Sequence, residues 1–335
     1  MIQVGVIGTG TWGKNHVRVW HEVQNVKLTA IADQDGATVK ELSSKYGIRG
    51  ETDYKKLLQD SAIDAVSICT PSSTHYTIAA EALKAGKHVL LEKPMALQSK
   101  ECMQLSALAE KMKKTLMIGH VFRFDPLVQT IKQEIQNGTL GTVDFIYTSR
   151  LGLMTPRPDC GVIFDFALHD IDIACFLLDQ LPKKVTAVGN TYRNKNARAF
   201  EDVGFITLEF PDGVLANAAV SWLTPKKVRD LWVIGSTRSI GADLITQQGD
   251  IYDKGIVPHY DNFGEFKLIR KSGSDTKMSV QVKEPLQEEI LHFIDCVLRG
   301  KMPLVPGTIG TQMVKIIEAC NQSIREHKTI EVEYD

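Results

Sequence analysis

The segment that most constrains the fold is a glycine-rich turn, GTGTWG, that directly follows the apolar residues 2–7. The apolar run predicts a buried strand, and residues 14–24 predict the helix after the turn. Gly8 permits the tight bend, Gly10 lets a pyrophosphate approach the backbone, and Gly13 lets the helix pack closely on the strand. The first N–H groups of the helix would then face the phosphates. The pattern predicts a dinucleotide-binding turn.

An acidic residue at the expected distance supports this interpretation. Asp33 ends a second apolar strand, residues 27–32, about 20 residues after the turn, where a carboxylate accepts hydrogen bonds from a ribose diol. A carboxylate repels a 2′-phosphate, and neighbouring Gln34 offers no compensating charge. We therefore expect NAD rather than NADP; the alternative is a glycine turn that binds nothing. The expected cofactor contacts here are Gly8, Thr9, Gly10, Thr11, Trp12 and Asp33.

Length and composition indicate two domains. A chain of 335 residues is too long for one ordinary core. The residues are 43% hydrophobic and 24% charged, and a net charge of −1 gives no electrostatic reason to expect nucleic acid or a membrane as partner. We expect neither a membrane helix nor a leader, because the first strand starts at the initiator Met. Six cysteines without a CxxC motif predict reduced thiols in a cytoplasmic protein.

The first 120 residues alternate short apolar strands with amphipathic helices. This alternation predicts a Rossmann-type domain, a doubly wound parallel sheet, over residues 1–120. Beyond the strands already named, we expect strands at 65–68, 88–91 and 115–119 and helices at 53–58, 74–85 and 99–113.

From about Thr139 the pattern changes to longer segments in which polar and apolar residues alternate. Strands predicted at 203–210 and 214–222 flank a hairpin signal, Pro211-Asp212-Gly213. We expect an α+β domain over residues 121–335, with a large, mostly antiparallel open sheet covered by helices on one face. Further strands are expected at 228–234, 240–246, 266–269 and 278–282, and helices at 285–299 and 308–326. The site is expected at the carboxyl ends of the parallel strands.

Two loops after parallel strands carry candidate site residues. Thr70 and Ser72 lie where a strand end meets a cofactor, although such residues also cap helices. Glu92-Lys93-Pro94 follows the next strand, where charge points into the crevice. There Lys93 could stabilise a substrate hydroxyl or relay its proton beside a nicotinamide. The expected cofactor contacts from these loops are Cys69, Thr70, Pro71, Ser72, His75, Glu92 and Lys93.

A third group lies at residues 165–172, DFALHDID. On an α-helix, Asp165, His169 and Asp172 share one stripe, separate from the apolar stripe of Leu168 and Ile171. A histidine with carboxylates one turn away on either side suits a general base. The alternatives are a surface ion pair, a core histidine, or an Asp/His/Asp site for zinc or manganese. We assign the group to catalysis and expect no metal.

Several arginines and a lysine leave their roles open. Arg123 follows the last strand of the first domain and either contacts substrate or cofactor or pairs with an acid; we include it among the cofactor-binding residues. Arg150, Arg157 and Lys226 either meet the diphosphate of a nucleotide or are solvated surface charges.

Five motifs, taken in order and spacing, resemble the Gfo/Idh/MocA family of nicotinamide-dependent sugar oxidoreductases. They are GTGTWG at 8–13, CTPSSTH at 69–75, EKP at 92–94, GHVFRFDP at 119–126 and DFALHDID at 165–172. The resemblance covers nearly the whole chain. It implies that Lys93, Asp165 and His169 are the catalytic residues, and that the protein is a homodimer or homotetramer built through the open face of the second sheet.

Residues 161–165, 284–286 and 303–305 most resemble members that act as 3-dehydrogenases on UDP-N-acetylhexosamines. The expected reaction is hydride transfer between a sugar or sugar-nucleotide hydroxyl and NAD. His169 would take the hydroxyl proton, Lys93 would stabilise the oxygen, and Asp165 would orient His169. The alternatives are oxidation of a free sugar or cyclitol, a non-catalytic protein that senses NAD or a sugar, and a hydrolase or lyase that uses oxidation only transiently.

Overall fold

The computed structural model describes residues 1–157, 159–193, 200–260 and 266–334. The chain divides into two units, which are described separately. The first contains Met1–Phe124 and Glu284–Glu318, and the second contains Asp125–Lys283 and Ala319–Glu333. The sequence analysis expected domains at 1–120 and 121–335, whereas the contacts group residues 284–318 with the first unit.

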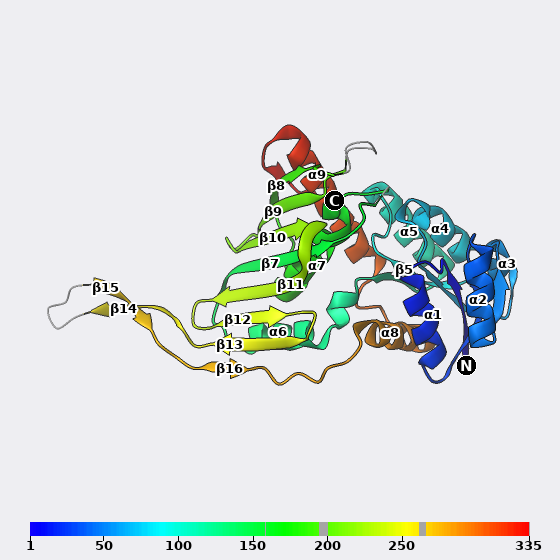
Figure 1. Ribbon diagram of the computed structural model, residues 1–335, viewed down its shortest axis with the longest axis horizontal. Helices are drawn as coiled ribbons and strands as arrows, with labels where there is room; N and C mark the ends of the chain where they lie inside the picture. Colours follow the sequence, from blue (N-terminus) through cyan, green and yellow to red (C-terminus); the bar gives the residue numbers. More distant parts are fainter. Residues whose placement is uncertain (158, 194–199, 261–265, 335) are drawn as a thin grey trace. The chain divides into compact units, whose positions relative to one another are not determined.

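A six-stranded parallel sheet forms the centre of the first unit, in the order β3-β2-β1-β4-β5-β6 (Figure 1). The strands are β1 (Ile2–Ile7), β2 (Val26–Ala32), β3 (Arg49–Glu51), β4 (Ala65–Ile68), β5 (His88–Glu92) and β6 (Leu116–Gly119). The connecting helices are α1 (Gly13–Glu22), α2 (Gly36–Tyr46), α3 (Lys55–Gln59), α4 (His75–Lys84) and α5 (Ser99–Met112). The predicted doubly wound sheet is confirmed. Its strand order reverses between β1 and β4, where such folds bind nucleotides.

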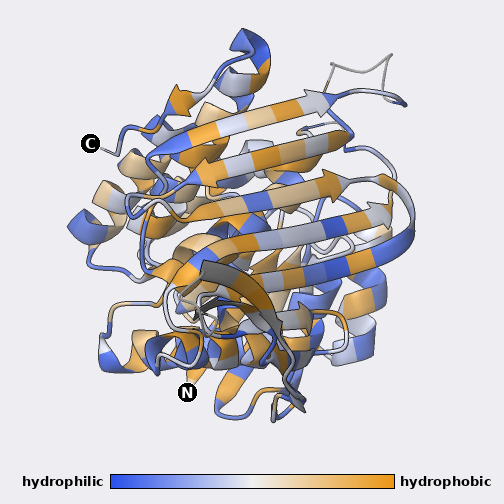
Figure 2. Cartoon of the chain, turned by 90° about the vertical axis from the view of Figure 1, so that its left-hand side faces the viewer, coloured by the Kyte–Doolittle hydropathy of each residue, from blue (hydrophilic) through white to orange (hydrophobic). Residues whose placement is uncertain are grey.

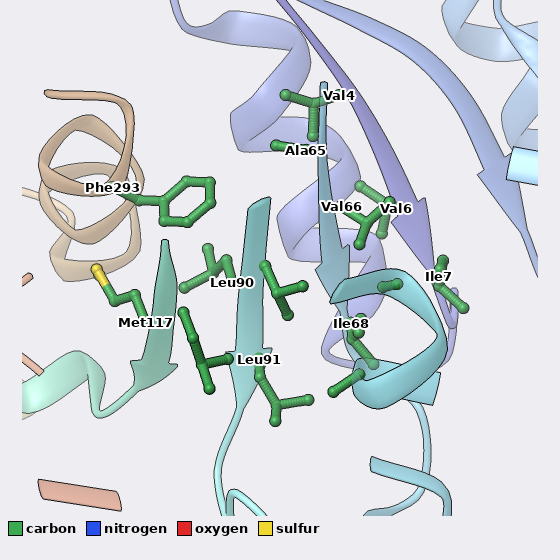
Figure 3. Packing of buried hydrophobic residues seen from close by; sticks show 14 of the residues in the cluster. Val4, Val6, Ile7, Ala65, Val66, Ile68, Leu90, Leu91, Met117 and Phe293 are labelled. Carbon is green, nitrogen blue, oxygen red and sulfur yellow. The ribbon is translucent and has the colours of Figure 1, made fainter. Parts of the chain in front are cut away.

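The core of the first unit surrounds these strands. Val4, Val66 and Leu90 are fully buried, as expected when helices cover both faces of a parallel sheet. Phe293 of helix α8 (Pro285–Arg299) lies in the same cluster (Figure 3). Its ring packs edge-on against Trp20, with ring centres 6.2 Å apart. Helix α8 is therefore part of this core although it is distant in sequence.

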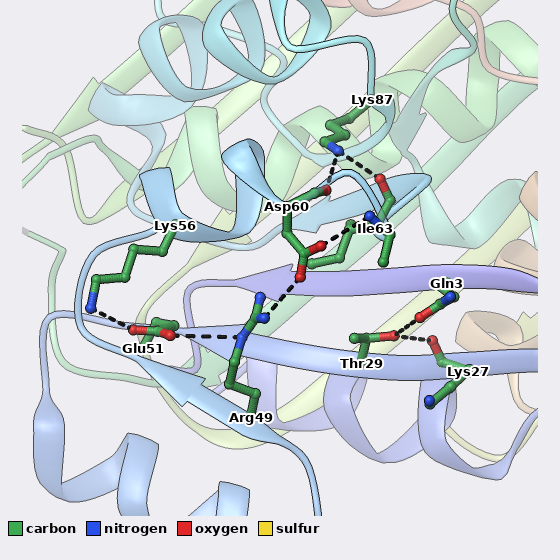
Figure 4. Close-up of polar contacts among 10 residues, drawn as sticks. Gln3, Lys27, Thr29, Arg49, Glu51, Lys56, Asp60, Ile63 and Lys87 are labelled. Atoms are coloured by element: carbon green, nitrogen blue, oxygen red, sulfur yellow. Dashed lines mark hydrogen bonds and ion pairs between the residues drawn. The ribbon is translucent and has the colours of Figure 1, made fainter.

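Charged side chains fasten the edge strand β3 (Figure 4). Arg49 pairs with Asp60 at 2.8 Å, and Lys56 pairs with Glu51 at 2.9 Å. Lys87 Nζ donates to the carbonyl oxygen of Asp60 at 2.6 Å. Because β3 consists of Arg, Gly and Glu, it has no apolar pattern, and the sequence analysis did not predict it.

Helix ends follow the expected chemistry. Asp35 caps α2 by accepting from the N–H of Ala37 at 3.0 Å. Gly47 and Gly300 end α2 and α8 in the left-handed conformation, with φ of 65° and 63°, which glycine adopts without steric cost. Pro285 begins α8, where its missing N–H has no helical partner to lose.

The second unit contains a nine-stranded sheet in the order β16-β13-β12-β11-β7-β10-β9-β8-β17. Only β7 and β10 pair in parallel among the described strands of this sheet. The mostly antiparallel sheet is thus confirmed, as is the hairpin at Gly213, which has a φ of 82°. The strands are β7 (Val143–Leu153), β8 (Lys184–Asn190), β9 (Val203–Glu209), β10 (Leu215–Ser221), β11 (Leu223–Gly235), β12 (Ser239–Asp243), β13 (Gln248–Tyr252), β16 (Asp275–Lys277) and β17 (Ile330–Glu331).

The remaining elements include three helices and a small second sheet. The helices are α6 (Pro126–Gln136), α7 (Leu168–Leu178) and α9 (Gly307–Glu326), and β14 (Gly255–Tyr260) pairs with β15 (Phe266–Lys271). The strand predicted at 278–282 is wrong. Its residues alternate in polarity, but pairing with β13 ends near Met278, whose N–H donates to Gly249. Val282 is 68% exposed, so alternation here reflects no buried face.

The two faces of the large sheet differ. Helix α7 contacts β7 and β10, whereas apolar side chains project from neighbouring strands on the other face and are about half exposed: Phe145, Tyr147, Val188, Phe205 and Leu215. Hydrophobic residues alternate with polar ones along these strands (Figure 2). Over the part of the chain that the structure describes, no helix combines the length and apolar character needed to span a bilayer.

Candidate active site

The glycine turn, residues 8–13, has the geometry of a phosphate cradle. Gly8 has a φ of +89°, and a β-carbon there would lie 2.7 Å from the backbone between Cys69 and Thr70. A β-carbon on Gly13 would lie 2.0 Å from the carbonyl oxygen of Gly8. By contrast, nothing lies within 4 Å of the β-carbon position of Gly10, which leaves the space that a pyrophosphate would fill. The turn therefore fits a dinucleotide.

Asp33 at the end of β2 is bonded directly to this turn. Its Oδ2 accepts from the N–H of Thr9 at 2.5 Å and from Thr9 Oγ1 at 3.1 Å. Its Oδ1 accepts from the N–H of Asp35 at 3.0 Å. The carboxylate is half-buried and therefore lies at the surface of the turn, where a ribose could reach it.

A buried carboxylate joins the glycine turn to the loop after β5. Glu92 is 6% exposed, and its Oε1 accepts from Trp12 Nε1 at 2.6 Å and lies 3.0 Å from His16 Nε2. Its Oε2 accepts from the N–H of Lys93 at 3.1 Å. Burial acts to raise the pKa of Glu92, but the hydrogen bond and charge of His16 outweigh it and lower the pKa overall, with help from Trp12 and Lys93. Glu92 is thus held as an anion.

The loops after β4 and β5 are held together by His75. Its ring is 1% exposed, with Nδ1 at 2.7 Å from the carbonyl oxygen of Pro94 and Nε2 at 2.8 Å from that of Thr70. Both ring nitrogens thus face backbone, which positions the loops around Lys93. Thr74 Oγ1 donates to Thr70 Oγ1 at 2.8 Å and forms no side-chain cap on α4.

The other predicted cofactor residues of the first unit differ in exposure. Ser72 and Arg123 are buried, at 2% and 6% exposed, so Arg123 is not a solvated surface charge. Cys69 is partly exposed and its Sγ lies 4.0 Å from Ser67 Oγ. Burial, followed by the charge of Glu92, raises the pKa of the Cys69 thiol well above its usual range.

In the second unit, Asp165 and His169 lie on a helix that begins irregularly. Residues Ile163–Ala167 form a π-helical turn, η3, and α7 continues from Leu168. The N–H of Leu168 donates to the carbonyl oxygen of Ile163, five residues earlier. The sequence analysis expected a regular α-helix over these residues, whereas its first turn is π-helical. Such turns are frequent at functional sites.

Asp165 and His169 differ in their surroundings. Asp165 is 8% exposed and accepts from Arg157 Nη1 at 3.2 Å, while Arg157 also holds Asp159 at 2.8 Å. His169 is half-buried, whereas Asp172 is 1% exposed. A buried carboxylate supported by an arginine thus precedes a partly accessible imidazole.

Glu201, which the sequence analysis did not identify, holds the start of the π turn. Its carbonyl oxygen accepts from the N–H of Val162 at 2.9 Å, and its Oε1 accepts from the N–H of Ile163 at 3.0 Å. Burial raises the pKa of its carboxyl group. Neither contact has a sequence signal, because Glu201 is distant in the chain and lies in an ordinary segment before β9.

Arg150 proves to be structural. It forms a two-pronged ion pair with Asp170, with an Nη2–Oδ1 distance of 2.8 Å, and both side chains are 3% exposed. The two alternatives considered for Arg150, diphosphate binding and solvation, are therefore both wrong. Arg157 pairs with Asp159 and Asp165 and is not simply solvated either, whereas Lys226 is exposed.

The sequence analysis did not identify two buried titratable side chains of the first unit, those of His16 and Glu289. His16 lies between Glu92 and Ser67, with Nδ1 at 2.8 Å from Ser67 Oγ. Glu289 on α8 is fully buried, and its carboxyl oxygens have no hydrogen-bond partner among the described residues. Burial, followed by the charge of Glu92, raises the pKa of Glu289 well above its ordinary value. Within the described ranges, no cluster of three His, Cys, Asp or Glu side chains is arranged to hold a metal ion.

Family models match both parts of the chain. Residues 2–120 match a model described as an oxidoreductase family with an NAD-binding Rossmann fold, and residues 132–332 match the C-terminal alpha/beta domain of the same family.

Individual relatives extend over nearly the full length. The UDP-N-acetylglucosamine 3-dehydrogenase of Acidithiobacillus ferrooxidans is 29% identical over 93% of this chain and 94% of that protein. The myo-inositol 2-dehydrogenase of Thermotoga maritima is 26% identical over 99% of both. A solved structure of the Acidithiobacillus ferrooxidans enzyme covers 97% of this chain and 98% of its own, with 24% identity and a TM-score of 0.82, which shows a shared fold.

Proposed function

The chain belongs to the Gfo/Idh/MocA family of oxidoreductases, and from this premise we propose that it transfers a hydride between a sugar-nucleotide hydroxyl and NAD. The proposed substrate is a UDP-N-acetylhexosamine, oxidised at C3. At the coarser level the protein is a sugar or cyclitol oxidoreductase with an NAD-binding Rossmann domain. The observation that carries the proposal is a buried, arginine-supported Asp165 one turn before a partly accessible His169.

The cofactor is proposed to lie on the glycine turn and its neighbours. The open space at Gly10 and the carboxylate of Asp33 suit a pyrophosphate and a ribose diol, and Asp33 favours NAD over NADP. The remaining proposed contacts are Gly8, Thr9, Thr11, Trp12, Cys69, Thr70, Pro71, Ser72, His75, Glu92, Lys93 and Arg123. When bound, NAD supplies the hydride chemistry, and the protein supplies position and charge.

The chain's own residues would manage the proton of the substrate. His169 takes the proton of the hydroxyl group, and Asp165 orients the imidazole and stabilises its cationic form. Lys93 donates to the same oxygen and stabilises its developing negative charge. The bond from the Lys93 N–H to Glu92 supports this role, because it fixes the backbone that carries the ammonium group.

The test is a panel of UDP-N-acetylhexosamines, free sugars and inositols, scored by NADH absorbance. Stoichiometric NADH with a sugar nucleotide supports the proposal. NADH with myo-inositol alone would favour cyclitol oxidation, which the Thermotoga relative suggests. Product without NADH would indicate transient oxidation, and NAD binding without turnover would indicate a sensor. Lys93→Ala and His169→Ala should each lower kcat about 100- to 10,000-fold and leave NAD affinity nearly unchanged; wild-type rates in both variants would exclude these roles.

We also propose that two copies of the chain pack through the open face of the large sheet, as a homodimer or within a homotetramer. Phe145 and Phe205 are 46% and 52% exposed there, and clustered apolar exposure is typical of protein interfaces. Light scattering should give a dimer or tetramer mass for the wild type and a lower mass for Phe205→Lys. A monomeric wild type would refute the proposal.

A further inference from the structure

Arg229 of β11 lies beside the proposed catalytic turn. The strand register places it opposite Arg150 of β7, so both side chains leave the same face of the sheet. Its Nη1 donates to the carbonyl oxygens of Leu151 and Val228, each at 2.6 Å. Its guanidinium carbon lies 4.7 Å from the ring centre of Phe166, the residue after Asp165. Two backbone carbonyl groups and the ring of Phe166 thus fix the position of the guanidinium.

The ion pairs next to Arg229 do not include it. Arg150 pairs with Asp170, and Arg157 pairs with both Asp159 and Asp165. Arg229 itself has no ion-pair partner in the part of the chain that the structure describes, and its Nε and Nη2 donate to no described group. At this half-buried position, the guanidinium therefore keeps donors that no described group accepts.

A half-buried guanidinium without an ion-pair partner is costly. Burial lowers the pKa of Arg229 to about 10, and the charge of Arg150 acts in the same direction, against the weaker effects of Asp170 and Asp165. An anion at the free edge of the guanidinium would offset both effects. The planar fork of arginine matches the oxygens of phosphate and carboxylate groups.

We propose that Arg229 binds a negatively charged group of the substrate, so that the enzyme selects an anionic sugar derivative over a neutral sugar. The inference rests on the proposed oxidoreductase function and assigns the charged group of its substrate to one residue. The oxyanion could be the phosphate of a sugar nucleotide or sugar phosphate, or the carboxylate of a sugar acid. Stacking on Phe166 places this anion site next to the turn that carries Asp165.

Measurements of anion binding test the role of Arg229 without requiring turnover. Isothermal titration of the wild type, saturated with NAD, should detect UDP, inorganic phosphate or glucuronate, none of which needs to be oxidised. Preferential binding of UDP or phosphate would identify a phosphate site, and preferential binding of glucuronate a carboxylate site. In Arg229→Gln the Kd of the preferred anion should rise roughly 10- to 100-fold, the range for hydrogen bonds to charged groups. If none of the three binds the wild type, the inference is wrong.

The matched control is Lys227→Gln, which removes the same charge from an exposed position on the same strand. It should leave the Kd of the anion unchanged. Equal weakening in both variants would indicate general electrostatics and overturn the inference. Arg229→Lys keeps the positive charge but lacks the planar guanidinium, and it tests the site even if Arg229→Gln does not fold. The Kd of the anion should rise several-fold in this variant. An unchanged Kd would refute binding by the guanidinium.

Turnover gives a second comparison. Arg229→Gln should raise the KM of the anionic substrate without changing the rate with myo-inositol, if the neutral compound is oxidised at all. Equal losses with charged and neutral substrates would show a structural role and refute the inference. If the wild type oxidises nothing in the panel, the proposed function fails, while the binding measurement still decides the role of Arg229.

Discussion

Gly161 lies directly against the carboxylate of Glu201, so that a β-carbon at position 161 would sit 2.0 Å from Glu201 Oε1. That carboxylate accepts from the N–H of Ile163, the first residue of the π turn. The turn that carries Asp165 therefore depends on the absence of a side chain at one position and the presence of a carboxylate at another.

Gly161→Ala should accordingly displace Glu201 and disturb the π turn. We expect a loss of roughly 1–3 kcal/mol in the free energy of unfolding, the usual range for overpacking, and a fall in kcat with little change in NAD affinity. Urea unfolding and steady-state kinetics measure both. Gly152→Ala is the control, since nothing lies within 4 Å of its β-carbon position; equal effects in the two variants would contradict the argument.

Glu289→Gln should stabilise the protein at alkaline pH. The pKa of Glu289 is raised in the folded state above its ordinary value of 4.5, so the folded protein binds a proton that the unfolded chain releases. The free energy of unfolding therefore falls as the pH rises from about the ordinary pKa of a glutamate toward the raised pKa of Glu289 in the folded protein. Glutamine is neutral throughout, so the variant should lose this dependence. Parallel Tm curves for the wild type and the variant between pH 5 and about pH 9 would refute the prediction.

Trp12→Phe should weaken NAD binding while keeping an aromatic ring. The variant loses the N–H that donates to Glu92 Oε1 at 2.6 Å, and a hydrogen bond to a charged group is worth about 1.5–3 kcal/mol. The bond joins two groups of the protein, so its loss should lower the free energy of unfolding by about that amount. Because it also positions the glycine turn, we expect the Kd of NAD to rise by up to roughly tenfold, measured by calorimetry. Adding Glu92→Gln to Trp12→Phe should weaken binding less than the sum of the two single changes; full additivity would show that the bond does not matter.

Arg150→Met should be among the most destabilising single changes in the second unit. It leaves the carboxylate of Asp170 buried without its partner, a situation that costs about 3–5 kcal/mol. The double variant Arg150→Met/Asp170→Leu removes both charges and should recover most of that loss. Denaturant unfolding of the three proteins checks this, and a double variant no more stable than Arg150→Met would argue against it.

The parts of the structure that the sequence predicted are those determined by neighbouring residues. The apolar strand Ile2–Ile7 and the glycine turn specify each other within a few residues, and Gly300 ends α8 where the pattern requires. Strand β3 was missed because its three residues carry no apolar signal; it is held by its pairing with β2 and by ion pairs such as Arg49–Asp60.

The remaining features depend on partners that are far away in the chain. Phe293 lies in the core of the first unit, and Asp170 neutralises Arg150, yet no local pattern announces either contact. The π turn likewise depends on a distant partner, because Glu201, which lies just before β9, bonds its first residue. Residue types suggested Asp165 and His169 as a pair, whereas the π-helical turn that carries Asp165 was visible only in the structure.

The bonds of Asp33 affect any attempt to redesign nucleotide preference. Its two oxygens accept from the backbone N–H groups of Thr9 and Asp35, so the acid holds the loop in place in addition to the role in cofactor choice that we propose for it. Removing it to admit a phosphorylated ribose would also loosen the loop that has to receive the dinucleotide. A switch toward NADP would therefore need a compensating acceptor for Thr9 in addition to a new cation.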